Sequence, residues 1–151
     1  MSDLHTTAVI KGHPIHAMLV PFPIVLFVAA LTTDAAFAVN GTETWAAASK
    51  WLLGAGIATA LLAALAGFAD FFGNSRIREL RDAWLHMFAN LTAVVVELVN
   101  FVIRLGNERA AGSIGLALSA VVALILLFSG WKGGELVFRY GVGQAHSAND
   151  R

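Results

Sequence analysis

The chain has 151 residues, of which 58% are hydrophobic and 13% are charged, whereas soluble domains contain about 45–50% apolar and about 25% charged residues. Ten Lys and Arg balance ten Asp and Glu, so the sequence lacks the basic surface that binding to nucleic acid requires. The absence of cysteine excludes disulfides, thiolate-bound iron–sulfur clusters and covalently attached c-type haem. The composition therefore indicates an integral membrane protein in contact with the lipid bilayer.

Four apolar segments are long enough to cross a membrane, which takes about 20 mostly apolar residues. They run, within about 2–4 residues at each end, from Met18 to Val39, from Trp45 to Phe72, from Ala83 to Leu105 and from Ile114 to Trp131. Short connections force neighbouring spans to run antiparallel. We therefore predict an all-α integral membrane fold, an antiparallel up-down-up-down bundle of four transmembrane helices over residues 13–141. The flanking residues 1–12 and 142–151 are expected to be disordered tails.

Lys and Arg are distributed unequally between the two ends of this bundle. The end with both termini carries Lys11, Arg76, Arg78, Arg81, Lys132, Arg139 and Arg151, and the other end carries Lys50, Arg104 and Arg109. Cytoplasmic loops of membrane proteins hold the excess of basic residues. Both termini are therefore predicted to be cytoplasmic.

Histidines and acidic residues from all four spans converge on this cytoplasmic end. They are His13 and His16 at the start of the first span, Asp70 near the end of the second, His86 at the start of the third, and Glu135 after the fourth. An ionisable side chain that faces lipid costs at least about 2.5–3.5 kcal/mol. We therefore expect His16, Asp70, His86 and Glu135 to form one cluster inside the bundle.

A polar stripe runs along the third span. At about 100° per residue, Asn90, Glu97, Asn100 and Arg104 lie within about 40° of His86 around the helix. These are polar positions on an otherwise apolar segment. The stripe is expected to face the interior of the bundle or a wet cavity.

Two acidic residues lie deeper in the spans, and their roles stay open. Asp34 follows His16 by eighteen residues, which is five helical turns, so both share a face unless the prolines between them rotate the helix. Glu97 lies on the stripe of the third span. Either carboxylate could relay protons from the far side or make a buried hydrogen bond, and Glu97 could pair with Arg104 on its own helix.

Four motifs cover nearly the whole chain: GHPIHAMLVPFPI at 12–24, GFAD at 67–70, WLH at 84–86 followed by Asn90, and SGWKGGELV at 129–137. Together they closely resemble a family of bacterial four-span membrane proteins, domain of unknown function 2231. The resemblance implies a multi-pass protein of the bacterial inner membrane. It also implies electron transfer, because similar proteins are at times fused to Rieske or cytochrome-like modules.

The family's characteristic polar residues fall, by matching position, on His13, His16, Asp70, His86, Asn90 and Glu135. The sequence departs from the family pattern at Ala17, where proline is common, and at Tyr140, where histidine is common. The second departure argues against a ligand role at position 140.

The leading hypothesis is a small electron-transfer protein that holds b-type haem between His86 and either His16 or His13. Diagonal helices in such a bundle lie about 12–14 Å apart, because neighbours pack about 8–10 Å apart. Two opposed histidines can share one iron across that distance. Basic residues at the same end, Arg139, Lys132 and Arg81, are candidates to pair with the haem propionates. A redox partner protein or a quinone would exchange the electrons, and the chain could form a homo-oligomer.

Two other hypotheses account for the same residues. The first is zinc or non-haem iron, with His16 and His86 as ligands and His13, Asp70 and Glu135 nearby, since mixed imidazole and carboxylate ligation suits these metals. The second is a hydrogen-bonded network that joins the helices or supports a partner. No nucleophile constellation or nucleotide-binding motif occurs, so a stand-alone enzyme is not indicated.

Overall fold

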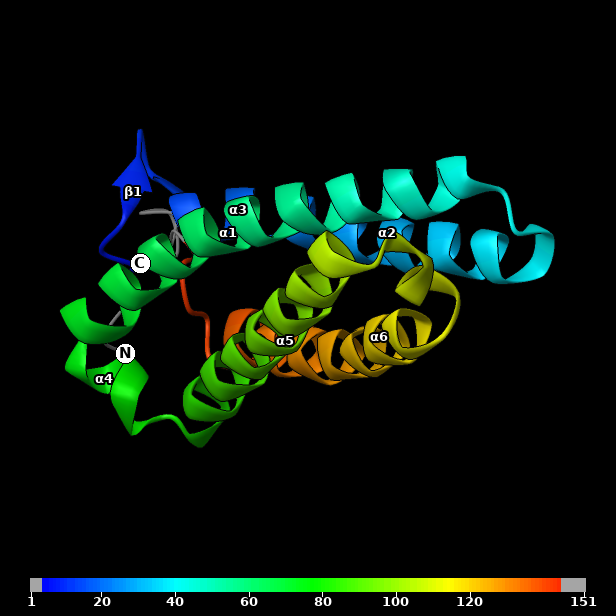
Figure 1. Ribbon diagram of the computed structural model, residues 1–151. Coiled ribbons are helices and arrows are strands. Elements are labelled where there is room, and N and C mark those ends of the chain that lie inside the picture. Colours follow the sequence, from blue (N-terminus) through cyan, green and yellow to red (C-terminus); the bar gives the residue numbers. More distant parts are fainter. Residues whose placement is uncertain (1–3, 145–151) are drawn as a thin grey trace.

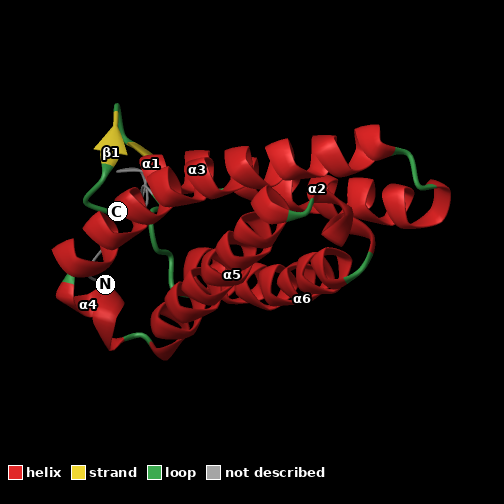
Figure 2. Cartoon of the chain, in the orientation of Figure 1, coloured by secondary structure: helices red, strands yellow, loops and turns green. Residues whose placement is uncertain are grey.

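The computed structural model describes residues 4–144, and helices dominate it (Figures 1 and 2). The elements in chain order are β1 (Val9–Ile10), β2 (His13–Pro14), α1 (Ile15–Leu19), α2 (Pro21–Asn40), α3 (Glu43–Gly73), α4 (Ser75–Glu79), α5 (Arg81–Gly106), the 3-10 helix η1 (Glu108–Gly112), α6 (Ile114–Gly134) and the π-helix η2 (Glu135–Arg139).

Four helical spans are long and apolar enough to cross a membrane: Ile15–Asn40, Glu43–Gly73, Arg81–Gly106 and Ile114–Arg139. The predicted all-α membrane bundle is confirmed, and each span starts or ends within a few residues of its expected position, apart from the extension of the fourth by η2. Around the bundle, α2 packs on α3, α3 on α5, α5 on α6, and α6 on α2. The first and third spans are therefore diagonal partners.

The first span is interrupted at Val20, between α1 and α2. Proline has no backbone N–H and is favoured in the first turn of a helix, and Pro21 starts α2. At the other end, Gly41 adopts a left-handed conformation with φ 67° and its N–H donates to the Phe37 carbonyl. This cap ends α2 before the tight connection to α3.

Two short strands precede the first span, and residues 1–3 of the segment expected to be a disordered tail lie outside the described residues. β1 and β2 form an antiparallel hairpin whose turn residues Lys11 and Gly12 both have positive φ, the conformation that two-residue hairpin turns favour. At the other terminus, the N–H of Gly143 donates to the carbonyl of Leu4. Residues 4 and 143 therefore lie together at one end of the bundle, called here the terminal end, while residues 145–151 of the predicted tail lie outside the described residues.

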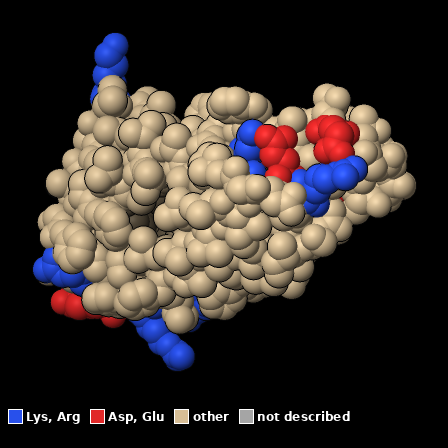
Figure 3. Space-filling model, viewed as in Figure 1, with Lys and Arg blue, Asp and Glu red and all other residues tan. Residues whose placement is uncertain are grey.

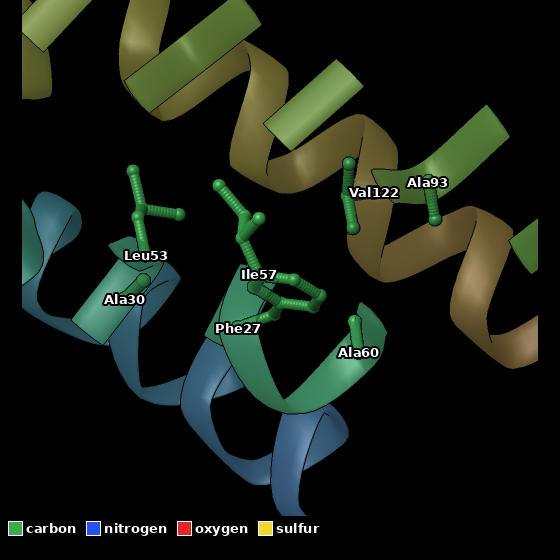
Figure 4. Close-up of a cluster of buried hydrophobic side chains, with 7 residues drawn as sticks. All are labelled: Phe27, Ala30, Leu53, Ile57, Ala60, Ala93 and Val122. Atoms are coloured by element: carbon green, nitrogen blue, oxygen red, sulfur yellow. The ribbon is translucent and has the colours of Figure 1, made fainter. Parts of the chain in front are cut away.

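An apolar layer fills the middle of the bundle. It consists of Phe27, Ala30, Leu53, Ile57, Ala60, Ala93 and Val122, contributed by all four spans (Figure 4). Gly56 lets α2 and α3 approach, because a Cβ there would lie 2.5 Å from the Phe27 ring. The layer separates polar groups at the terminal end from a second set at the opposite end.

The outer surface of the spans is mostly apolar. Charged side chains on the visible face gather toward the two ends and leave a wide uncharged band between them (Figure 3). Large apolar side chains such as Leu65, Leu124 and Leu127 are exposed, which suits contact with lipid. Trp51 and Trp131 are also exposed, and both lie toward span ends, as interfacial aromatic residues do.

Candidate functional site

A cavity of about 610 Å³ lies at the terminal end, among residues from all four spans. Its polar lining includes His16, Asp70, His86 and Asn90, and most other lining residues are apolar. Phe27, Ala60 and Ala93 of the apolar layer also line it. The visible surface is hollowed beside α5 (Figure 3).

The side chain of His16 is held against α3 by a backbone carbonyl of that helix. The ring Nδ1 lies 2.8 Å from the carbonyl oxygen of Ala63. Gly67 lies one turn further along α3, and a Cβ there would meet His16 Nδ1 at 2.9 Å. Because Gly67 has no side chain, the imidazole of His16 can occupy this space.

His86 is held against α6 in the same manner. Its Nδ1 lies 2.9 Å from the carbonyl oxygen of Ser129 and 3.1 Å from the Ser129 hydroxyl. Here Gly133 provides the space, since a Cβ would lie 3.0 Å from His86 Cε1. The Asn90 amide nitrogen donates to the carbonyl of His86 at 2.8 Å and lies 3.2 Å from His86 Nε2.

The two histidines face each other across the diagonal of the bundle. Their ring centroids are 6.1 Å apart and the ring planes are nearly perpendicular, at 88°. A carbonyl oxygen only accepts hydrogen bonds, so Nδ1 of each neutral ring carries the hydrogen and Nε2 carries the lone pair. Backbone carbonyls thus fix both rings in the tautomer in which Nε2 can act as a ligand.

Asp70 lines the same cavity but has a structural partner. Its Oδ1 accepts hydrogen bonds from the backbone N–H groups of Thr7 and Ala8, both at 2.7 Å. These bonds fasten the N-terminal segment over the terminal end, where Thr6 and Gly143 also line the cavity. Asp70 therefore acts as a latch for the segment that covers the site.

Three residues expected at the site lie outside the cavity. His13 is exposed and its Nδ1 lies 3.1 Å from the carbonyl of Lys11, because Pro14 belongs to β2 and the helix begins only at Ile15. Glu135 pairs with Arg139 one turn later at 3.2 Å, and neither side chain lines the cavity. The structure thus joins His16, Asp70 and His86 but not Glu135.

The other basic residues proposed near the propionates are partly engaged. Lys132 forms an ion pair with Asp82 at 2.8 Å, and the hydroxyl of Tyr140 donates to the same carboxylate at 3.2 Å. Arg81 is exposed. Within residues 4–144, no group of three or more His, Cys, Asp or Glu side chains is placed to hold a metal ion.

A second buried polar cluster lies at the opposite end: the sequence predicted that the polar stripe of the third span faces inward, but it did not predict the pairing of Arg104 with Asp34. Arg104 forms two parallel hydrogen bonds with the Asp34 carboxylate, at 2.5 and 2.7 Å, and both side chains have no exposed surface. The cluster also contains Ser49, Ser119, Asn100 and Glu97.

Arg104 was counted among the basic residues of this end, and its side chain is buried there, as expected for the polar stripe of the third span. Its guanidinium turns inward to Asp34. The surface cations at this end are Lys50, which pairs with Glu108, and Arg109, which pairs with Glu43 at 2.8 Å. The signal was present in the sequence, because Arg104 lies on the polar stripe of the third span and Asp34 on the inner face of the first.

Comparison with known proteins gives a family and no activity. Residues 12–146 match the family model described as "Predicted membrane protein (DUF2231)". No curated protein and no solved structure matches the chain.

Proposed function

The chain belongs to the DUF2231 family of predicted membrane proteins, and from that premise we propose a small membrane electron-transfer protein that binds b-type haem through His16 and His86. The observation that carries the proposal is the pair of cavity histidines on diagonal spans, each with Nδ1 held by a backbone carbonyl. Ligand histidines commonly donate their second ring N–H to a backbone carbonyl or carboxylate. We prefer His16 to His13 as the second ligand because His13 is exposed and lies outside the cavity.

The separation of the rings supports a shared metal. Two metal–nitrogen bonds of about 2 Å, with about 1.1 Å from each nitrogen to its ring centroid, separate opposed imidazole centroids by about 6 Å. The observed separation is 6.1 Å. The cavity volume of about 610 Å³ also lies in the range of sites that enclose small organic ligands, about 300–1,000 Å³.

Asn90 is the residue that must respond to a ligand at His86. Its amide nitrogen lies 3.2 Å from His86 Nε2, the atom that would bind iron. The stronger contact of this amide, at 2.8 Å, is with the carbonyl of His86. Asn90 can therefore keep its backbone hydrogen bond and release Nε2.

The haem would supply the one-electron chemistry, and the chain would supply binding and orientation. His16 and His86 would hold the iron, and the apolar lining would exclude water from the ring. At the rim, Arg81 is exposed, while Lys132 and Arg139 would have to share their present carboxylate partners with the propionates. A quinone in the bilayer or a redox partner protein is the expected electron donor or acceptor.

Absorption spectroscopy of the purified protein tests the proposal. Protein from haem-replete cells should show a Soret band and sharp reduced-minus-oxidised bands, with about one haem per chain. His86→Ala and His16→Ala should each remove the haem or change the iron from a low-spin to a high-spin spectrum. His13→Ala is the matched control, because His13 is exposed, and it should keep the wild-type spectrum.

Two results would overturn the haem proposal. The first is a wild-type protein that stays colourless after haem is added, and the second is an unchanged low-spin spectrum in both His16→Ala and His86→Ala. Elemental analysis for zinc and iron would then test the non-haem metal. If no metal were found, hydrogen bonding among His86, Ser129 and Asn90 would stand as a structural network.

A further inference from the structure

The buried cluster at the opposite end contains more acidic than basic groups. Asp34 and Glu97 each carry one carboxyl group and Arg104 carries one guanidinium, and all three residues have no exposed surface. Fully ionised, the cluster would hold one net negative charge inside an apolar bundle. An isolated buried carboxylate is so costly that such groups usually become neutral instead.

Asp34 has every feature of the ionised partner. Its Oδ1 accepts from the Ser49 hydroxyl at 2.6 Å and from Arg104, and its Oδ2 accepts from the Ser119 hydroxyl at 2.8 Å and from Arg104. Hydrogen bonds from a cation and two hydroxyls stabilise the charged form of a carboxyl group. The positive charge of Arg104 is therefore balanced by the carboxylate of Asp34.

The position of the guanidinium is fixed as well. A Cβ on Gly115 would lie 2.9 Å from Arg104 Nη2, so the glycine of α6 makes room for that nitrogen. On its other side, Arg104 Nε donates to the side-chain amide oxygen Oδ1 of Asn100 at 3.0 Å. Neither contact directs the guanidinium toward Glu97.

Glu97 has a much poorer set of partners. Its Oε2 accepts from the Asn100 amide at 2.9 Å, and its Oε1 has no hydrogen-bond partner among the described residues. The amide nitrogen of Asn100 is also within reach of the Gly115 carbonyl and the Ser119 hydroxyl. One shared neutral donor is weak support for a full negative charge in the interior of a membrane protein.

Among the ion pairs of residues 4–144, none includes Glu97. Asp34 comes from α2 and Arg104 from α5 itself, while α3 and α6 add the neutral Ser49 and Ser119. Toward the terminal end, the apolar layer with Ala93 and Val122 lies between Glu97 and the histidine cavity. Exchange of a proton with water is therefore expected at the opposite end.

We propose that Glu97 is a proton-binding site and that it is a neutral carboxylic acid in the folded protein at neutral pH. The orphaned Oε1 carries the acid hydrogen, while Oε2 accepts from Asn100. Asp34 and Arg104 remain an ion pair beside it, so the whole cluster has no net charge. The proposal does not depend on the nature of the ligand in the histidine cavity.

Infrared spectroscopy of the full chain in lipid vesicles at neutral pH tests this directly. A protonated carboxyl group has a carbonyl stretch well separated from the bands of a carboxylate. The wild type should show this band, it should shift in heavy water, and it should be lost in Glu97→Gln and shifted in Glu97→Asp. Glu108→Gln is the matched control at the same end, because Glu108 pairs with Lys50 near the surface, and it should leave the band unchanged.

Isotope labelling assigns the band without any variant. Biosynthetic labelling of glutamate carboxyl groups should shift it, and labelling of aspartate should not. The proposal is overturned if the wild type lacks the band, if the band moves with labelled aspartate, or if it persists in Glu97→Gln. Appearance of the band only after sodium is removed would assign the site to a metal cation in place of a proton.

Discussion

Removal of one partner from the buried ion pair should destabilise the protein strongly. Asp34→Asn keeps the size of the side chain but removes the charge that balances Arg104. The guanidinium would stay fully buried without the carboxylate that now makes two hydrogen bonds to it, and the Asn amide group would point hydrogen-bond donors at other donors. Breaking a buried ion pair by removing one partner costs about 3–5 kcal/mol, a large part of a typical unfolding free energy of about 5–15 kcal/mol.

Equilibrium unfolding in mixed micelles with increasing sodium dodecyl sulfate measures this change. Glu43→Gln is the control, since it breaks the exposed pair with Arg109, whose side chains are 59% and 73% exposed. Exposed pairs contribute about 0–1 kcal/mol. The double variant Asp34→Leu with Arg104→Met removes both buried charges and should recover more than half of the loss. A loss for Asp34→Asn no larger than that of Glu43→Gln would refute the view that this pair holds the four spans together.

Gly67→Ala would place a Cβ 2.9 Å from His16 Nδ1, so it should displace the imidazole and weaken haem binding at the cavity by at least tenfold in a haem titration. Gly134→Ala is the control, because a Cβ there meets an atom only at 4.0 Å, and it should bind haem as the wild type does. Equal affinity in both variants would contradict the packing argument. Asp70→Asn removes the charge from the latch on the N-terminal segment, which should speed amide hydrogen exchange at residues 7 and 8 without unfolding the spans, and unchanged exchange would show that the two hydrogen bonds are not limiting. A periplasm-active reporter should be inactive at the C-terminus and active in the loop near Asn107, and the opposite pattern would reverse the predicted orientation.

The four spans and their order around the bundle follow from features that are local in sequence. Long apolar runs define the helices, and short loops make successive spans antiparallel. Parity then places His16 and His86 at the same end and on diagonal helices, which is why their proximity could be anticipated. Which of His13 and His16 lines the cavity depends on where the helix begins, and Pro14 belongs to β2, so the helix starts only at Ile15.

Other features required knowledge of pairings between distant residues. Glu135 was expected at the histidine cluster, but Arg139, four residues later, offered a closer partner. The hairpin before the first span depends on hydrogen bonds to Asp70 across more than sixty residues. The inward turn of Arg104 depends on Asp34 in another span. Composition and periodicity report none of these contacts.

The apolar layer across the middle of the bundle also bears on how the protein would respond to membrane voltage. His86 and Glu97 are separated by about 16 Å along α5, at 1.5 Å per residue, with Ala93 of the layer between them. If the two histidines hold haem as proposed, an electron passed from it to a carrier at the same surface would cross only a small part of the transmembrane field. Its rate should respond little to the membrane potential. Conduction from one leaflet to the other would require a second redox centre beyond the layer.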